Sequence, residues 1–294
     1  TAAVLATAAF GATNSIPDVP AYLWYNGCGP TAAGMIIGFW DAHGFGNLIV
    51  AGNGSNSWDT NQQAVKDMIA SPGHIRDYVP TPDRKATPTD PYHPDDCVAD
   101  FMRASRDPLG YGASFEDMQN AGLTGYAAFC GYHGWQGEYT YFGGVWNLLV
   151  TAINAGRPAE LFVDSNADGA PDHYVTAVGY DDTPGAQKYA AYNTYDRVVH
   201  WYSYAPVQGG RSYGVESGTF FRMFLAGDAN RDGDVDFQDY QALEGNFGRT
   251  VGATWSMGDF SADGDVDFAD YQALELNFGH SAPEPALAAL LIPG

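Results

Sequence analysis

Two residues far apart in the sequence have the side chains and settings that nucleophilic catalysis requires. Cys28 lies between two glycines, directly before an apolar stretch typical of a buried helix. A thiol at a helix N-terminus is at the positive end of the helix dipole, which lowers its pKa from about 8.5 toward about 3.5–7.5 and favours the thiolate. His173 begins the strand-like segment 173–180 and could serve as the base for that thiol. Either residue alone also fits a buried structural position.

The segment 192–196 offers a partner for the imidazole. It reads Tyr-Asn-Thr-Tyr-Asp and follows the next expected strand. Asn193 or Asp196 could accept a hydrogen bond from the second ring nitrogen of His173 and fix its tautomer. The three groups together predict a thiol–imidazole site with an orienting residue.

A second kind of chemistry is indicated by two near-identical segments that start at Gly227 and Gly258. Each has acidic or other oxygen-bearing residues at alternate positions, then glycine at position six, then further acids and a helical run. Calcium prefers several oxygen ligands at this spacing, as in EF-hand loops. The expected ligands are Asp228, Asn230, Asp232, Asp234, Asp236 and Asp239 in the first loop, and Asp259, Ser261, Asp263, Asp265, Asp267 and Asp270 in the second.

A partial copy of the same pattern directly precedes His173. It holds Asp164, Asn166, Asp168 and Asp172, with Gly169 at position six, but Val175 stands where the closing acid would be. A turn rich in Asp and Asn accounts for the pattern more simply. The alternative is a cation that stiffens the loop next to the expected base.

The segments 27–35, 172–181 and 192–196, with Cys-Gly-Pro-Thr and His-Tyr-Val-x-x-Val-Gly-Tyr in this order, resemble the C39-like cysteine peptidases of the papain-like superfamily. The resemblance covers about residues 16–205. It implies a papain-like α+β fold in which Cys28 is the nucleophile and His173 the base. It further implies that Asn193 orients the imidazole, with Asp196 as the second choice.

One position departs from that family, which usually has a glutamine shortly before the cysteine as an oxyanion-hole donor. The corresponding stretch here is Tyr22-Leu-Trp-Tyr-Asn26. The Tyr22 hydroxyl, the Trp24 indole N–H or the Asn26 amide could replace it, beside the backbone N–H of Cys28. Loss of one such donor costs on the order of a hundredfold or more in rate.

The C-terminal repeats resemble the dockerin module, with Asp at position twelve followed by Tyr-Gln-Ala-Leu-Glu and Asn-Phe-Gly. The resemblance implies a small all-α module of two paired loop–helix halves, two calcium ions and a cohesin-like partner. Its recognition positions hold Phe237-Gln238 and Phe268-Ala269, which are not the usual small hydroxyl residues. The tail 281–294, with Pro283-Glu284-Pro285 and an apolar run, is similar to a truncated PEP-CTERM sorting signal.

The secondary structure expected to position these residues changes from helices to strands near residue 156. Helices are expected over 30–40, over 57–70 with Ser57 as a cap, over 95–105 and over 142–155. A further helix is expected to start at a capping box over 114–117. The proline-rich segment 71–94 predicts an irregular loop that shapes substrate access. Strands are expected over 159–163, 173–180, 188–193, 198–204 and 218–225, which together give an α+β fold with separate layers.

The composition of the chain limits its partners and the compartment in which it acts. The chain has 13 basic and 35 acidic residues and a formal net charge of −22, which argues against nucleic acid and anionic membranes as partners. Three cysteines allow one Cys97–Cys130 bridge or buried free thiols. We expect a residual leader over 1–15, a peptidase domain over 16–225, calcium-binding repeats over 226–280 and a sorting tail over 281–294 that could anchor the chain to a cell surface.

These observations predict an exported cysteine peptidase that acts on peptides or proteins, found outside the cell or at its surface. Two other functions use the same residues. One is a catalytically weak or inactive surface-binding protein on a peptidase-like scaffold, and the other is an acyltransferase that uses the same thiol.

Overall fold

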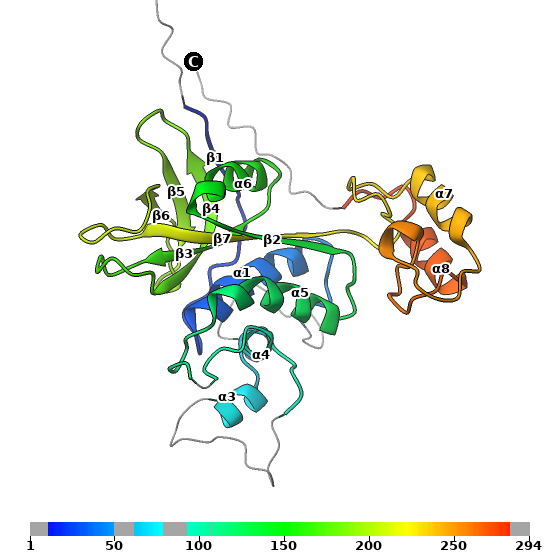
Figure 1. Ribbon diagram of the computed structural model, residues 1–294, viewed down its shortest axis with the longest axis horizontal. Helices are drawn as coiled ribbons and strands as arrows, with labels where there is room; N and C mark the ends of the chain where they lie inside the picture. Colours follow the sequence, from blue (N-terminus) through cyan, green and yellow to red (C-terminus); the bar gives the residue numbers. More distant parts are fainter. Residues whose placement is uncertain (1–10, 50–61, 79–92, 107, 283–294) are drawn as a thin grey trace, which may run out of the picture.

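The computed structural model describes residues 11–49, 62–78, 93–106 and 108–282 (Figure 1). Its α-helices are α1 Cys28–Ala42, α2 Gln63–Ile69, α3 Pro72–Tyr78, α4 Val98–Phe101, α5 Gln119–Phe129, α6 Phe142–Asn154, α7 Phe237–Asn246 and α8 Phe268–Asn277, with 3₁₀ turns at Glu116–Met118 and Trp255–Met257. Its strands are β1 Thr13–Ser15, β2 Trp135–Tyr141, β3 Ala159–Asp164, β4 His173–Asp181, β5 Lys188–Tyr192, β6 His200–Ser203 and β7 Gly214–Met223.

The described strands form one antiparallel sheet in the order β2-β7-β3-β4-β5-β6. β4 is central and buried along almost its whole length, which agrees with its run of Val, Ala and Tyr residues. β3 pairs with the first part of β4, and β1 pairs with the last three residues, Gly179–Asp181. His173 therefore begins the strand that the rest of the sheet holds most firmly.

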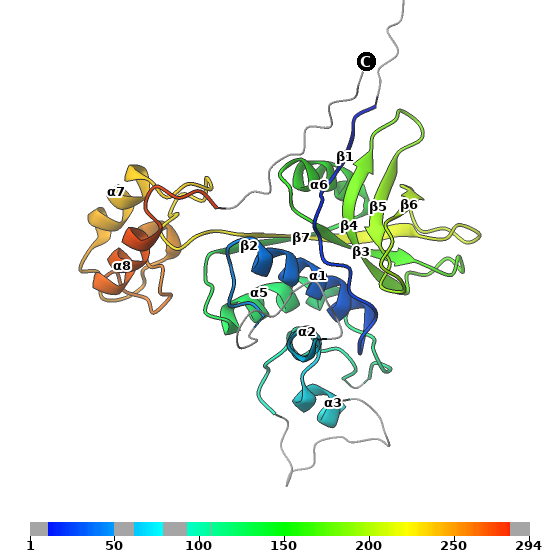
Figure 2. The same cartoon turned by 180° about the vertical axis from the view of Figure 1, so that it is seen from behind.

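Helices cover both sides of the sheet. α1 and α5 lie on one side and α6 on the other (Figures 1 and 2). α1 is buried from Gly29 to Trp40 because it is apolar all round, as expected for a helix inside a core. The Thr176 hydroxyl on β4 donates to the Ala32 carbonyl of α1 at 2.9 Å, which fixes the helix against the strand. This contact brings the N-terminus of α1 to the start of β4.

The C-terminal repeats form a separate small module at the far end of β7 (Figure 1). Its own core consists of Ala229, Val235, Leu243, Phe260, Val266 and Leu274. In α7 and α8 alike, an aspartate caps the helix and a second aspartate three residues later completes a capping box. The two near-identical sequence repeats therefore fold into two matching halves.

The expected α+β class with an antiparallel sheet is confirmed, as are the helices over 28–42 and 142–154. The prediction of an irregular loop from residue 71 is wrong for Pro72–Tyr78, which is helical. Pro72 starts this helix instead of only ending the previous one, because the Ser71 hydroxyl accepts the His74 N–H at 3.1 Å. Ser57 and most of the proline-rich segment lie outside the described residues.

Two further differences concern the ends of elements. The capping box expected at 114–117 does not form, because the Ser114 hydroxyl accepts the Gln119 side-chain amide at 3.0 Å. Residues Thr13–Ser15, which we expected in the leader, pair with β4 as β1.

All three cysteines are free thiols, so the expectation of buried free thiols holds for Cys97 and the Cys97–Cys130 bridge is absent.

Candidate active site

Cys28 is the first residue of α1. Gly27 before it has a φ of 141° and a main chain in close contact with Gly112, a conformation that favours glycine. The Thr31 hydroxyl donates to the Gly27 carbonyl at 2.6 Å and accepts the Tyr25 N–H at 3.0 Å, which closes the turn. The sequence around Cys28 therefore builds a tight turn that presents the thiol at the helix start.

Main-chain N–H groups surround the sulfur. The thiol of Cys28 interacts with the backbone N–H groups of Tyr174, Gly29 and Cys28 itself. Tyr174 follows His173 on β4, so the thiol lies beside the strand start that carries the expected base. The Tyr174 contact could not be predicted from residue types, because most residues at this position would supply the same main-chain donor.

Burial has the larger effect on the thiol. Desolvation raises the pKa of Cys28 above its ordinary value, although the three N–H groups act in the opposite direction. The expectation that the helix dipole lowers this pKa is therefore wrong in direction. A dipole at a helix end is worth about 0.3–1 kcal/mol at exposed sites, and the withdrawal of the sulfur from water outweighs it here.

His173 is buried and held in one tautomer. Its Nε2–H donates to the main-chain carbonyl of Asn193 at 2.8 Å, since a carbonyl can only accept. Nδ1 is then the free acceptor of the neutral ring, and the Tyr195 hydroxyl lies 3.4 Å from it. Burial lowers the pKa of His173, which keeps the imidazole neutral at pH 7.

Asn193 lies where the resemblance implies an orienting residue, but it acts through its backbone. Its side-chain oxygen accepts the N–H groups of Tyr195 and Asp196 at 3.0 and 3.3 Å, and so shapes the turn that presents the carbonyl. Asp196, the second choice, is engaged elsewhere, because both of its oxygens lie 2.9 Å from His200 Nε2. Its selection as a partner of His173 is therefore wrong.

Tyr195 is a site residue that sequence analysis missed. Its ring stacks on the His173 imidazole with centroids 4.7 Å apart and planes 8° from parallel, although the residue itself is exposed. Its hydroxyl lies on the Nδ1 side of the imidazole, so the ring covers one face of the expected base. The only signal in the sequence is its position two residues after Asn193.

The three residues considered as oxyanion donors lie in different places. Trp24 packs edge-on against Tyr111 at 5.6 Å, and its main-chain N–H donates to the Thr194 carbonyl at 2.7 Å. Asn26 is buried next to the Cys28 turn, with its side-chain oxygen accepting the Tyr111 hydroxyl at 3.0 Å. Of the three, Asn26 and Trp24 flank the site.

Tyr22 lies elsewhere. A Cβ added at Gly38 would be 2.2 Å from its hydroxyl oxygen. Gly38 is ten residues along α1 from Cys28, a distance of about 15 Å at 1.5 Å per residue. Tyr22 is therefore wrong as an oxyanion donor, because it packs against the opposite end of the helix.

We expect Tyr22→Phe to leave peptide hydrolysis within about twofold of wild type. It should also preserve or raise stability by about 1 kcal/mol, because the buried Tyr22 hydroxyl has no hydrogen-bond partner among the described residues. Initial rates on an unstructured protein substrate and thermal melts would measure both effects. A hundredfold loss of rate in a folded variant would return Tyr22 to the site.

Two buried polar residues behind the thiol were also missed. Gln119 begins α5, and its side-chain oxygen lies 3.1 Å from where a Cβ on Gly29 would be, with no hydrogen-bond donor for it among the described residues. Glu160 on β3 is fully buried, and burial raises its pKa well above the ordinary value. Gln119 presents an acceptor and not a donor to this side, because its NH₂ group donates to Ser114 and Phe115.

The loop before His173 is held together by its own side chains. Asp164 accepts the N–H groups of Ala167 and Gly169 at 2.7 and 2.8 Å, and Asp172 accepts the Ser165 N–H at 2.7 Å. Asn166 and Asp168 each accept the N–H two residues later. These are the bonds of an Asp- and Asn-rich turn. The turn fixes the start of β4, and a cation there stays a prediction.

The C-terminal loops contain carboxylate oxygens without hydrogen-bond donors. One oxygen each of Asp228, Asp259 and Asp265, and the Ser261 hydroxyl, are buried with no partner among the described residues. Oxygens of Asp265, Asp267 and Asp270 lie within 4.8 Å of one another. Burial raises the pKa of Asp228 to about 6. Such crowded and undersatisfied oxygens fit a bound cation of the calcium class.

None of the helices within the described ranges has both the length and the apolar character needed to cross a bilayer. The expected sorting tail after residue 282 lies outside those ranges.

Comparisons with known proteins agree with the N-terminal part of this description. The Peptidase_C39-like family model matches residues 16–210. The chain is also similar to the structure of active wild-type Prevotella intermedia interpain A cysteine protease, at 13% identity and a TM-score of 0.42, over 72% of this chain and 95% of that one. No curated protein matches it. Since the family match spans about two thirds of its residues, the chain belongs to the Peptidase_C39-like family and contains a cysteine-peptidase-like domain.

Proposed function

We propose that the protein is an exported cysteine peptidase that hydrolyses peptide bonds through Cys28 and His173. The single observation that carries this proposal is the arrangement at the start of β4. The thiol lies against the Tyr174 N–H, and the adjacent His173 is held with Nε2 protonated, so that Nδ1, which the Tyr195 hydroxyl approaches at 3.4 Å, is the nitrogen that can accept a proton. That tautomer is the one a general base needs.

The reaction proceeds by proton transfer and acyl transfer. As the Cys28 sulfur attacks the substrate carbonyl carbon, its proton moves to His173 Nδ1, and the imidazolium then protonates the leaving amine. Water, deprotonated by the same nitrogen, attacks the thioester and releases the acid. The Asn193 carbonyl holds the ring throughout and stabilises the imidazolium.

The oxyanion forms one bond away from the sulfur, and main-chain donors are already present there. The N–H groups of Cys28 and Gly29 at the helix N-terminus act on the sulfur, and the glutamine next to Gly29, Gln119, turns its acceptor oxygen to this side. Asn26, which is buried next to the same turn, is the side chain best placed to add a donor. Backbone donors thus replace the missing family glutamine, at some cost in rate.

The C-terminal module binds two calcium ions in this proposal, one in each acidic loop. The unpaired oxygens of Asp228, Asp259 and Asp265 support it, because a divalent cation would supply the positive charge that they lack. Exposed Phe237 and Phe268 at the recognition positions favour an apolar contact on a cohesin-like partner. The proposal also includes anchoring at the cell surface and action outside the cell, which are supported by the resemblance of the tail 281–294 to a PEP-CTERM signal.

Labelling with an electrophilic peptide probe tests the peptidase assignment. We expect covalent modification at Cys28, found by peptide mapping, because the adjacent His173 can take the thiol proton as the sulfur reacts. Burial raises the pKa of all three thiols, so the fully buried Cys97 and the part-buried Cys130 serve as internal controls that should stay unmodified. Labelling confined to Cys97 or Cys130, or absent in folded protein, would favour the binding-protein alternative. Product analysis with an added amine separates hydrolysis from acyl transfer.

The pH dependence of that labelling has a definite sign. The pKa of His173 is lowered and that of Cys28 is raised, so both groups are neutral over a window that includes pH 7. Labelling should rise as His173 loses its proton below pH 6.5, reach a plateau, and rise again as the thiol ionises above pH 9. The first rise should vanish in His173→Gln. A rate that is already maximal at pH 5 would instead show a thiolate–imidazolium pair.

A further inference from the structure

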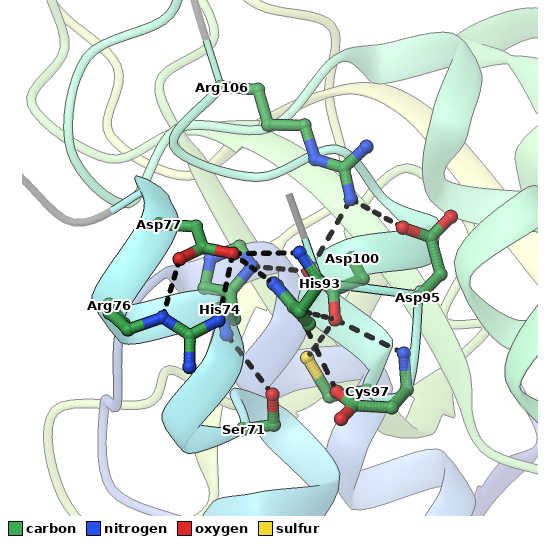
Figure 3. A network of polar contacts seen from close by, with 10 residues as sticks. Ser71, His74, Arg76, Asp77, His93, Asp95, Cys97, Asp100 and Arg106 are labelled. Carbon is green, nitrogen blue, oxygen red and sulfur yellow. Dashed lines mark hydrogen bonds and ion pairs between the residues drawn. The ribbon is translucent and has the colours of Figure 1, made fainter. Parts of the chain in front are cut away.

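A second cluster of cysteine, histidine and aspartate side chains is assembled from parts of the chain that take no part in the proposed hydrolysis. His74 lies in α3, Cys97 directly precedes α4, and Asp100 lies within α4. His93 comes a few residues before Cys97. Figure 3 shows these four side chains pointing toward one another.

Asp100 is the centre of the cluster. One of its oxygens lies 2.8 Å from His74 Nδ1, and the other lies 2.9 Å from His93 Nε2 and 3.1 Å from the Cys97 sulfur. Ligand atoms of His74, Cys97 and Asp100 all lie within 4.8 Å of one another. Ligand atoms of His93, Asp96 and Asp100 satisfy the same condition. The two sets share Asp100, so a thiol and two imidazoles lie against the two oxygens of one carboxylate.

The cluster is withdrawn from solvent. The side chains of His74 and Asp100 are 0% exposed, and that of His93 is 8% exposed. Cys97 is fully buried, and His74 Nε2 has no hydrogen-bond partner among the described residues. Buried polar groups of this kind are normally satisfied or coordinate a metal. The unpartnered Nε2 lies on the ring edge away from Asp100, so what points to a ligand is the gathering of a buried thiol and two imidazoles on one buried carboxylate.

The donor set selects the class of ion. Calcium and magnesium prefer oxygen ligands alone, whereas zinc is bound tetrahedrally by thiolate, imidazole and carboxylate. With Zn–S near 2.3 Å and Zn–N and Zn–O near 2.0–2.2 Å, tetrahedral geometry separates ligand atoms by about 3.4–3.6 Å. The three ligand atoms now lie 2.8–3.1 Å from the Asp100 oxygens, so insertion of an ion requires these contacts to lengthen by about 0.3–0.8 Å.

Side chains that would hold the ligands in place are already present. His93 Nδ1 lies 2.7 Å from Asp77, and the Arg76 Nε–H donates to the same carboxylate at 2.8 Å. A metal-binding histidine typically donates its other ring N–H to a carboxylate in this way. Arg106 donates to Asp95 at 2.7 Å and lies 3.4 Å from Asp100, which orients the central carboxylate from the other side.

We propose that His74, His93, Cys97 and Asp100 bind one zinc-class divalent transition-metal ion. Four protein ligands leave no open coordination position, so the site is structural and not catalytic. It ties α3 to the start of α4 and is independent of both the thiol chemistry at Cys28 and the acidic loops of the C-terminal module. The competing explanation is a hydrogen-bonded network in which a protonated His93 bridges Asp77 and Asp100.

Cobalt substitution separates these explanations, because only a cobalt–thiolate bond gives an intense near-ultraviolet charge-transfer band. Metal-free full-length protein would be titrated with Co²⁺ in excess Ca²⁺, which saturates the acidic loops. We expect one equivalent of Co²⁺ to produce the band, and Zn²⁺ to displace it. The acidic loops contain no sulfur and cannot contribute to this signal.

Matched variants assign the thiol and the outer ligands. Cys97→Ser should abolish the band, while Cys130→Ser and Cys28→Ala should keep it. His93→Gln should weaken Co²⁺ binding, and Asp77→Asn, which touches no metal, should weaken it by about 10–100-fold. Circular dichroism checks that each variant folds. If Cys97→Ser does not fold, the weaker Co²⁺ binding expected for His93→Gln still tests the site. No thiolate band in the wild-type protein, or a band that survives Cys97→Ser, would overturn the proposal.

Discussion

Cys28→Ala should reduce peptide hydrolysis to the uncatalysed background, a loss of at least about 10⁴-fold, because no other group at the site can form the acyl intermediate. His173→Gln should lower the rate by about 10²–10⁴-fold, as expected when the general base is lost and the nucleophile is kept. Rates on a fluorogenic peptide library would measure both. Thermal melts check folding, since Cys28 is only partly buried and its truncation is mild.

Asn193→Ala is the informative control for this pair. The hydrogen bond to His173 comes from the backbone carbonyl of residue 193, so removal of the amide leaves that acceptor in place. We therefore expect a rate loss of about tenfold or less, caused by a looser turn at Tyr195 and Asp196. Hydrolysis that persists in Cys28→Ala would refute the peptidase assignment, whatever the result for Asn193→Ala.

Removal of calcium should unfold the C-terminal module and leave the peptidase-like domain intact. Only six buried residues form the core of the module, so it has little stability of its own. At a calcium concentration one hundred times Kd, each site adds about 2.7 kcal/mol. Hydrogen exchange measured by mass spectrometry should show fast exchange over residues 227–282 in chelator, with residues 11–225 unchanged.

Position-one variants provide the matched controls for that experiment. Asp228→Asn and Asp259→Asn alter the same position in the two loops, and each native side chain has one unpaired buried oxygen. Each single variant should bind one calcium ion fewer by isothermal calorimetry, and the double variant should resemble protein in chelator. Exchange over 227–282 that does not respond to chelator would show that the acidic loops fold without metal.

The parts of the fold that could be predicted from the sequence are those with long local signals. α1 and α6 are apolar segments bounded by glycine or proline, and β3 to β5 are short apolar runs between turn residues. β2 was missed because Trp135–Tyr141 mixes polar and aromatic residues, and its partner β7 lies far along the chain. β1 is only three residues long and is a strand only because β4 offers a free edge.

The candidate site could be predicted only as far as residue types reveal it. Cys28 and His173 stand in recognisable segments, but the orienting acceptor is a main-chain carbonyl, which any residue at 193 would supply. The direction of the Cys28 pKa shift depends on burial, which the helix-dipole argument leaves out. The His74–Asp100 cluster was invisible because Pro72 was interpreted as the beginning of a loop.

Three backbone contacts join the halves of the site: the Tyr174 N–H with the thiol, the Asn193 carbonyl with the imidazole, and the Trp24 N–H with the Thr194 carbonyl. Because each contact is made by main-chain atoms of residues 24, 174 or 193, it does not depend on which amino acid stands there, although the Asn193 side chain shapes the turn that presents its carbonyl. Pattern searches keyed to a conserved amide or glutamine would then overlook relatives of this chain that share its architecture.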